Sequence, residues 1–164
     1  MTSRFYNRMI FILSLAGAVD ALVLTLNHAQ VVNAPCGPLH GCAYVDMDAA
    51  AAGLGIPGLQ SIPTAVFGLV MYLFLMAVSF LRIATTDEKP DSKLPAIQLG
   101  VSLLGVIISG WLTYREAYVI HHWCRYCVVS AIIILLICFT AILEQLHRKD
   151  TPVMPASLPE GEPS

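Results

Sequence analysis

Four stretches of the sequence are each long enough and apolar enough to cross a lipid bilayer as a helix. They cover about residues 9–28, 61–83, 95–118 and 126–146, and a membrane-spanning helix needs about 20 apolar residues. Charged residues make up only 12% of the chain and hydrophobic residues 57%, whereas a soluble domain devotes about a quarter of its residues to charge. The sequence therefore predicts an all-α integral membrane protein, a four-helix bundle.

The first stretch, taken alone, has the length of a signal peptide. No small-residue cleavage site clearly follows it, and three further apolar stretches do. We interpret it as a retained helix. Nucleic-acid binding is not expected, because the chain has no basic patch to hold phosphates.

The basic residues predict how the bundle is oriented in the membrane. Lys and Arg accumulate on the cytoplasmic side of membrane proteins. Seven of the nine fall at the N-terminus, between the second and third spans, or after the fourth: Arg4, Arg8, Arg82, Lys89, Lys93, Arg148 and Lys149. The long first loop, about residues 29–60, has none. We expect both termini in the cytoplasm, this loop outside it, and residues 147–164, rich in Pro, Glu and Ser, as a disordered cytoplasmic tail.

Cys124 and Cys127 form a C-x-x-C motif at the outer mouth of the fourth span. If the helix begins there, the two sulfurs lie one turn apart on one face. The positive end of the helix dipole would stabilise a thiolate, so the pair could form and break a disulfide readily. The alternatives are a static disulfide, or part of a zinc site completed by His121 and His122.

Cys36 and Cys42 form a second close pair, in the first loop, and enclose five residues that include two glycines and Pro38. In an oxidising compartment such a pair forms a small disulfide. It could merely staple the loop, but so small a ring gains little stability. Two pairs on the same side of the membrane favour exchange through a mixed disulfide. Cys138 lies about 16 Å deeper than Cys127 on the same helix, where we expect a buried, unreactive thiol.

Asp20 is an acidic residue inside the first span, and intramembrane acids are usually functional or paired. It is expected either to carry protons or hydrogen-bond a bound ligand, or to bond a neighbouring helix in its protonated form. Five aromatic residues cluster near the outer interface, and an interfacial aromatic belt explains most of them: Trp111, Tyr114, Tyr118, Trp123 and Tyr126.

The order of these motifs resembles the bacterial branch of the vitamin K epoxide reductase family. The resemblance covers about residues 9–146. It is carried by C-x5-C at Cys36 and Cys42, Ser61-Ile62-Pro63 with Gly68 and Tyr72, and Cys124-Arg125-Tyr126-Cys127-Val128-Val129-Ser130-Ala131. Family members often have glycine where Ser61 stands, and many bacterial members carry a fused thioredoxin-like domain, which residues 147–164 are too short to form.

The resemblance implies a catalytic domain over residues 1–146 that surrounds a quinone, either ubiquinone or menaquinone. Cys127, Ser130 and Asp20 would contact the quinone, and Cys36 and Cys42 would act as the shuttle. The expected function is a quinone-dependent thiol–disulfide oxidoreductase of the inner (plasma) membrane that supports disulfide bond formation. Its electron donor would be a separate periplasmic or extracytoplasmic thioredoxin-fold protein of the DsbA-like type.

Three alternatives remain open at the level of sequence. A DsbB-type oxidase is a second redox candidate, but that family places its C-x-x-C in the first loop, the reverse of the order here. Reduction of vitamin K epoxide itself is a third redox activity. A small metal-binding membrane carrier that uses the cysteines with His121 and His122 belongs to a different class. Redox trapping with a quinone, against metal analysis, separates the two classes.

Overall fold

The fold is an all-helical bundle, as predicted. The computed structural model describes residues 3–29, 31, 62–84, 93–121 and 123–150. Four long α-helices fill these ranges: α1 (Ser3–His28), α3 (Thr64–Ala84), α4 (Leu94–Arg115) and α5 (Arg125–Asp150). A short π-helical turn, η2 (Glu116–Ile120), extends α4. All four helices are long and apolar enough to cross a membrane.

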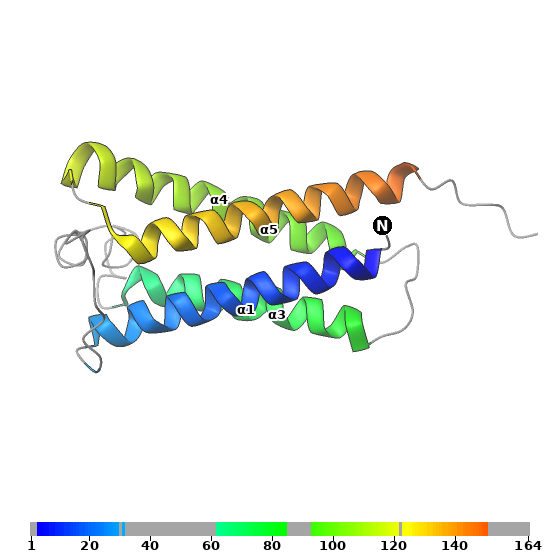
Figure 1. The fold of residues 1–164 in the computed structure, drawn as a ribbon, viewed down its shortest axis with the longest axis horizontal. Coiled ribbons are helices and arrows are strands. Elements are labelled where there is room, and N and C mark those ends of the chain that lie inside the picture. Colours follow the sequence, from blue (N-terminus) through cyan, green and yellow to red (C-terminus); the bar gives the residue numbers. More distant parts are fainter. Residues whose placement is uncertain (1–2, 30, 32–61, 85–92, 122, 151–164) are drawn as a thin grey trace, which may run out of the picture.

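The four helices run up and down along one long axis (Figure 1). α1 packs against α3 and α5, and α4 packs mainly against α5. α1 ends, α3 begins, α4 continues into η2 and α5 begins at one end of the bundle, which we call the motif end (Figure 1). The opposite ends of the same helices meet at the other end, which we call the terminal end.

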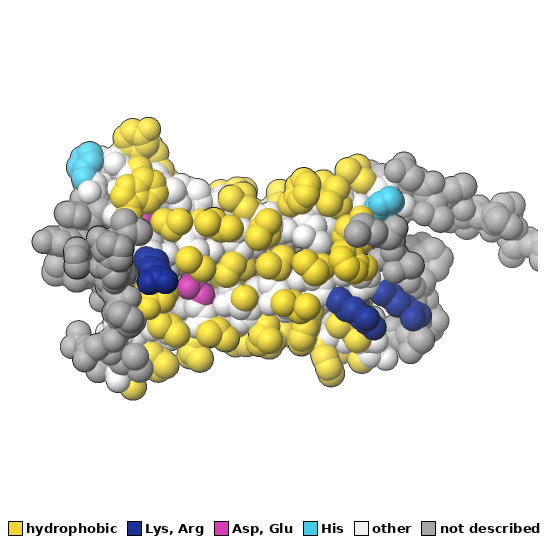
Figure 2. Space-filling view, viewed as in Figure 1, with side chains coloured by type: hydrophobic (Ala, Val, Ile, Leu, Met, Phe, Trp, Pro, Cys, Tyr) yellow, Lys and Arg dark blue, Asp and Glu magenta, His cyan; other side chains and the backbone are white. Residues whose placement is uncertain are grey.

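The outer surface of the bundle is apolar along its length. Figure 2 shows hydrophobic side chains covering this face, with the Lys and Arg side chains near its two ends. Large apolar side chains are exposed on every helix, for example Val19, Val70, Ile107 and Phe139. Such a surface is unfavourable in water and suits a hydrocarbon environment. The chain is therefore a multi-pass membrane protein.

The core centres on Tyr72, which is only 1% exposed. Its ring lies directly against the backbone of α1 at Gly17, where a β-carbon would collide with the ring. Ile10, Ile134 and Ile137 are buried around the same axis. Gly17 therefore sets how closely α1 and α3 approach each other.

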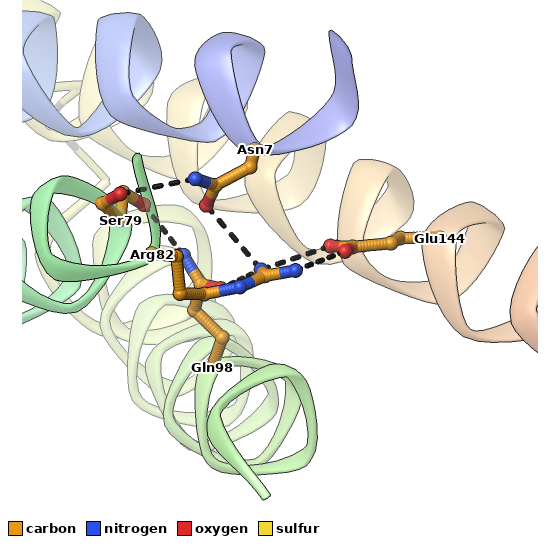
Figure 3. Close-up of polar contacts among 5 residues, drawn as sticks. All are labelled: Asn7, Ser79, Arg82, Gln98 and Glu144. Carbon is orange, nitrogen blue, oxygen red and sulfur yellow. Dashed lines mark hydrogen bonds and ion pairs between the residues drawn. The ribbon is translucent and has the colours of Figure 1, made fainter. Parts of the chain in front are cut away.

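A buried polar cluster ties all four helices together at the terminal end (Figure 3). Its members are Asn7, Ser79, Arg82, Gln98 and Glu144. Arg82 forms an ion pair with Glu144, and their side chains are 8% and 2% exposed. The Arg82 guanidinium also donates to Gln98 Oε1 at 2.5 Å and to Asn7 Oδ1 at 3.3 Å.

Two further bonds complete the cluster, because Gln98 Nε2 donates to Ser79 Oγ at 2.5 Å and Asn7 Nδ2 donates to the Ser79 carbonyl at 3.0 Å. Charges and amides buried in an apolar bundle are costly unless they are bonded, and here they bond one another. Arg82 was counted among the basic residues that orient the chain. Its charge is instead neutralised inside the bundle by Glu144.

The helices extend beyond the expected spans. α1 begins at Ser3 rather than near residue 9, and α5 continues to Asp150, past residue 146. Polar residues of these extensions can face headgroups, and Asn7 is held inside by the polar cluster. Most of the first loop, with Cys36, Cys42 and Ser61, lies outside the described residues, as does the tail after residue 150.

Candidate active site

The C-x-x-C motif lies at the start of α5, at the motif end. α5 begins at Arg125, and the first bond of the helix runs from the Val128 N–H to the Cys124 carbonyl at 3.1 Å. Cys124 is thus the residue that caps the helix, and Cys127 lies in its first turn. The helix begins where the sequence predicted, so the two sulfurs lie on one face.

The two thiols are in contact within the protein rather than at its surface. Cys124 is fully buried and Cys127 is half-buried. The structure holds both as thiols, with a hydrogen bond between their side chains. Two thiols in contact can become a disulfide with only a small movement, so the pair is arranged for reversible oxidation.

A carboxylate that the sequence analysis did not single out completes this arrangement. Glu116 is only 2% exposed, and its Oε2 accepts the backbone N–H of Cys124 at 3.2 Å. Its side chain also hydrogen-bonds the thiol of Cys127. Glu116 is the first residue of η2, and the chain then reverses at His121, which has a φ of 55°. A π turn widens the helix by one residue and redirects the side chains around it.

Ser130, one turn beyond Cys127, is bound by Tyr72 from α3. The Tyr72 hydroxyl lies 2.9 Å from Ser130 Oγ and donates to the Ser130 carbonyl at 3.0 Å. This contact fixes α5 against α3 just below the C-x-x-C motif. Tyr72 and Ser130 therefore connect the motif to the core of the bundle.

Two buried polar atoms on α1 have no hydrogen-bond partner among the described residues: Asp20 Oδ2 and Ser14 Oγ. Asp20 is close enough to Tyr72 to interact with it electrostatically. The alternative that Asp20 simply bonds a neighbouring helix is not seen for this oxygen within the described ranges. A buried polar group left unpaired costs free energy, so these two atoms are candidates for holding a polar ligand.

The remaining sequence candidates occupy separate places. Trp111, Tyr114 and Tyr118 are more than half exposed, and ring contacts of 6.4 and 5.0 Å join them in series on the outside of the bundle. Cys138 is buried, at 6% exposure. In the ranges that the structure describes, no group of three or more His, Cys, Asp and Glu side chains could hold a metal ion.

Comparison with protein families identifies the chain. The model of the vitamin K epoxide reductase family matches residues 8–142, which span all four helices. The chain belongs to the vitamin K epoxide reductase family. No curated protein matches it significantly. Membership in the vitamin K epoxide reductase family, whose members act with quinones, and the four apolar helices make this chain a membrane oxidoreductase of the quinone or epoxide reductase type.

Proposed function

We propose that this vitamin K epoxide reductase family member is a thiol oxidase that passes electrons from thiols outside the cytoplasm to a membrane quinone. The observation that carries the proposal is the contact between Cys124 and Cys127 at the start of α5, inside an apolar bundle. A dithiol in that position can meet a lipid-soluble acceptor that an aqueous thiol cannot reach.

Cys124 is assigned the exchange with the shuttle, and Cys127 the contact with the acceptor. Cys124 caps the helix, and Cys127 lies about 4.5 Å further along its axis. Attack on the sulfur of Cys124 in the oxidised motif would release Cys127 as a thiolate. That thiolate would lie next to the carboxyl group of Glu116, which hydrogen-bonds the Cys127 side chain.

The shuttle is assigned to Cys36 and Cys42, which lie outside the described residues. His28 ends α1 and Thr64 begins α3, and these two flanks of the loop segment lie at the motif end. The loop pair is therefore tethered at the end of the bundle that holds the C-x-x-C motif. We assign its reduction to a separate thioredoxin-fold protein of the DsbA-like type.

The quinone would lie beside Cys127, between α1, α3 and α5. The buried, unpaired Asp20 Oδ2 fits such a ligand, because a protonated carboxyl can donate to a carbonyl oxygen. Ser130 Oγ, held by Tyr72, is a second candidate contact. A bound quinone supplies a two-electron, two-proton acceptor. Ubiquinone and menaquinone share this chemistry.

The orientation proposed from the basic residues places the motif end outside the cytoplasm and both termini inside it. Six of the seven cytoplasmic Lys and Arg residues remain after Arg82 is set aside as an internal ion-pair partner. The protein would thus take electrons from thiols on the outer side of the inner (plasma) membrane and support disulfide formation there.

The decisive experiment measures quinol formation by the purified chain with a reduced thioredoxin-fold donor and a short-chain ubiquinone or menaquinone. The wild-type chain and Cys138→Ser should both turn over, whereas Cys127→Ser should be inactive. Equal activity of Cys127→Ser and Cys138→Ser would show that the C-x-x-C motif is not the redox centre.

A further inference from the structure

Glu116 lies beside the C-x-x-C motif, and among the described residues two hydrogen-bond donors contact its carboxylate. One is the backbone N–H of Cys124, at 3.2 Å, and the other is the thiol of Cys127. An ionised carboxylate only accepts hydrogen bonds, so the thiol is the donor. At 2% exposure, Glu116 has almost no access to water as a substitute partner.

Oxidation of the motif removes one of these two donors. When Cys124 and Cys127 join in a disulfide, Cys127 no longer has an S–H group. The carboxylate of Glu116 would then stay buried with one donor fewer. A buried charge that loses a hydrogen-bond partner is strongly disfavoured, and uptake of a proton relieves it.

We propose that Glu116 holds one proton of the oxidised motif: it takes up a proton when the Cys124–Cys127 disulfide forms and releases it when the disulfide is reduced. This inference rests on the proposed function in that it takes the pair to be redox-active. Among the described residues, the titratable groups that face Glu116 are Cys124, which precedes α5, and Cys127 in its first turn, and those that act on Cys127 are Cys124 and Glu116.

The electrons and protons balance over one cycle. The two thiols lose two electrons and two protons as the S–S bond forms. In the proposed oxidase a quinone would accept both electrons and one of the thiol protons, Glu116 would keep the other thiol proton, and the second proton of the quinol would come from water. When the loop dithiol reduces the motif, its two protons restore the thiols and Glu116 returns its proton to water.

The test is the thiol–disulfide equilibrium of the motif with dithiothreitol, measured against pH without quinone. The full-length chain with Cys36, Cys42 and Cys138 replaced by serine leaves only the C-x-x-C motif to titrate. Both couples exchange two electrons and two protons, so without Glu116 their equilibrium does not depend on pH below thiol ionisation. With Glu116, reduction of the motif releases one extra proton. The equilibrium therefore shifts tenfold toward the reduced motif for each unit by which the pH rises.

We expect that tenfold slope over at least one unit between about pH 5 and 8, below ordinary thiol ionisation. Glu116→Gln keeps an oxygen that can accept the Cys124 N–H but cannot take up the proton, so its equilibrium should be flat. The matched control, Asp20→Asn, removes the intramembrane acid of α1 and should keep the slope. A flat wild-type equilibrium, or a slope that survives in Glu116→Gln, overturns the proposal.

A second measurement needs no Glu116 variant to fold. The redox-difference infrared spectrum of the same serine-substituted chain should gain a protonated-carboxyl carbonyl band on oxidation, and Asp20→Asn should keep it. A spectrum without this band overturns the proposal. Neither measurement uses a quinone, so a failure of quinol formation would refute the proposed oxidase and leave the Glu116 result standing.

Discussion

The guanidinium of Arg82 on α3 forms a buried ion pair with the carboxylate of Glu144 on α5. Glu144→Gln should destabilise the bundle by about 3–5 kcal/mol, because it leaves a buried cation without its counter-charge. Unfolding in detergent measures this change. Arg8→Gln, at an exposed position of α1, is the control and should stay within about 0.5 kcal/mol of the wild type. A small loss in Glu144→Gln would mean that Gln98 and Asn7 alone satisfy Arg82.

The contact between Gly17 and Tyr72 should make α1 intolerant of a methyl group. Gly17→Ala places a β-carbon against the Tyr72 ring and should cost about 1–3 kcal/mol, as overpacking does. Gly100→Ala on α4 is the matched control, because no atom lies within 4 Å of its new β-carbon. The control should be neutral or stabilising by up to about 1 kcal/mol. Equal melting temperatures of the two variants would contradict this account of the α1–α3 interface.

The hydroxyl of Tyr72 should contribute to stability through its contacts with Ser130, in addition to the packing of the ring. Tyr72→Phe keeps the packing against Gly17 but loses both contacts with Ser130, at a cost of about 0.5–1.5 kcal/mol. Tyr114→Phe, at an exposed position, is its control. If Ser130 helps to hold the quinone, Tyr72→Phe should also change the quinone KM. An unchanged stability would mean that water replaces the hydroxyl.

The two cysteine pairs should differ in which thiol donors they are needed for. Cys36→Ser or Cys42→Ser should abolish quinol formation from a thioredoxin-fold donor but spare turnover with a small dithiol that reaches Cys124 directly. Cys127→Ser should abolish both. Loop variants with full activity toward the protein donor would refute the shuttle.

The orientation predicts which thiols a membrane-impermeant reagent reaches. After mild reduction of intact cells, Cys36 and Cys42 should be labelled from outside, and buried Cys138 only after unfolding. Cys124 is fully buried, so its labelling from outside should be slow. Labelling of the loop pair only in inverted vesicles would reverse the assignment of the two ends.

The sequence predicted the four helices because apolar length alone decides them, and it placed the start of α5 at the C-x-x-C motif. It missed the first turns of α1, since Arg4, Asn7 and Arg8 end the apolar stretch although the helix continues through them. It counted Arg82 only among the basic residues that orient the chain, because its partner Glu144 is 62 positions away and only packing brings the two together.

The sequence did not indicate a role for Glu116, for a different reason. It sits at the end of an apolar span beside Arg115, where an ordinary interfacial charge is expected. Its place at the motif depends on a π turn and on the left-handed backbone at His121, and residue types alone do not predict either. The available signal was its position eight residues before Cys124.

That short separation has a consequence for how the motif assembles. The hydrogen bond between Glu116 and Cys124 closes a ring over eight positions of one continuous segment. In the polar cluster at the other end, by contrast, the bonds from Arg82 to Glu144 and to Asn7 join residues 62 and 75 positions apart. Short rings close quickly and at low entropic cost. Glu116 and the two cysteines that it contacts are therefore close together in the sequence. Their contacts can form before the four helices pack against one another.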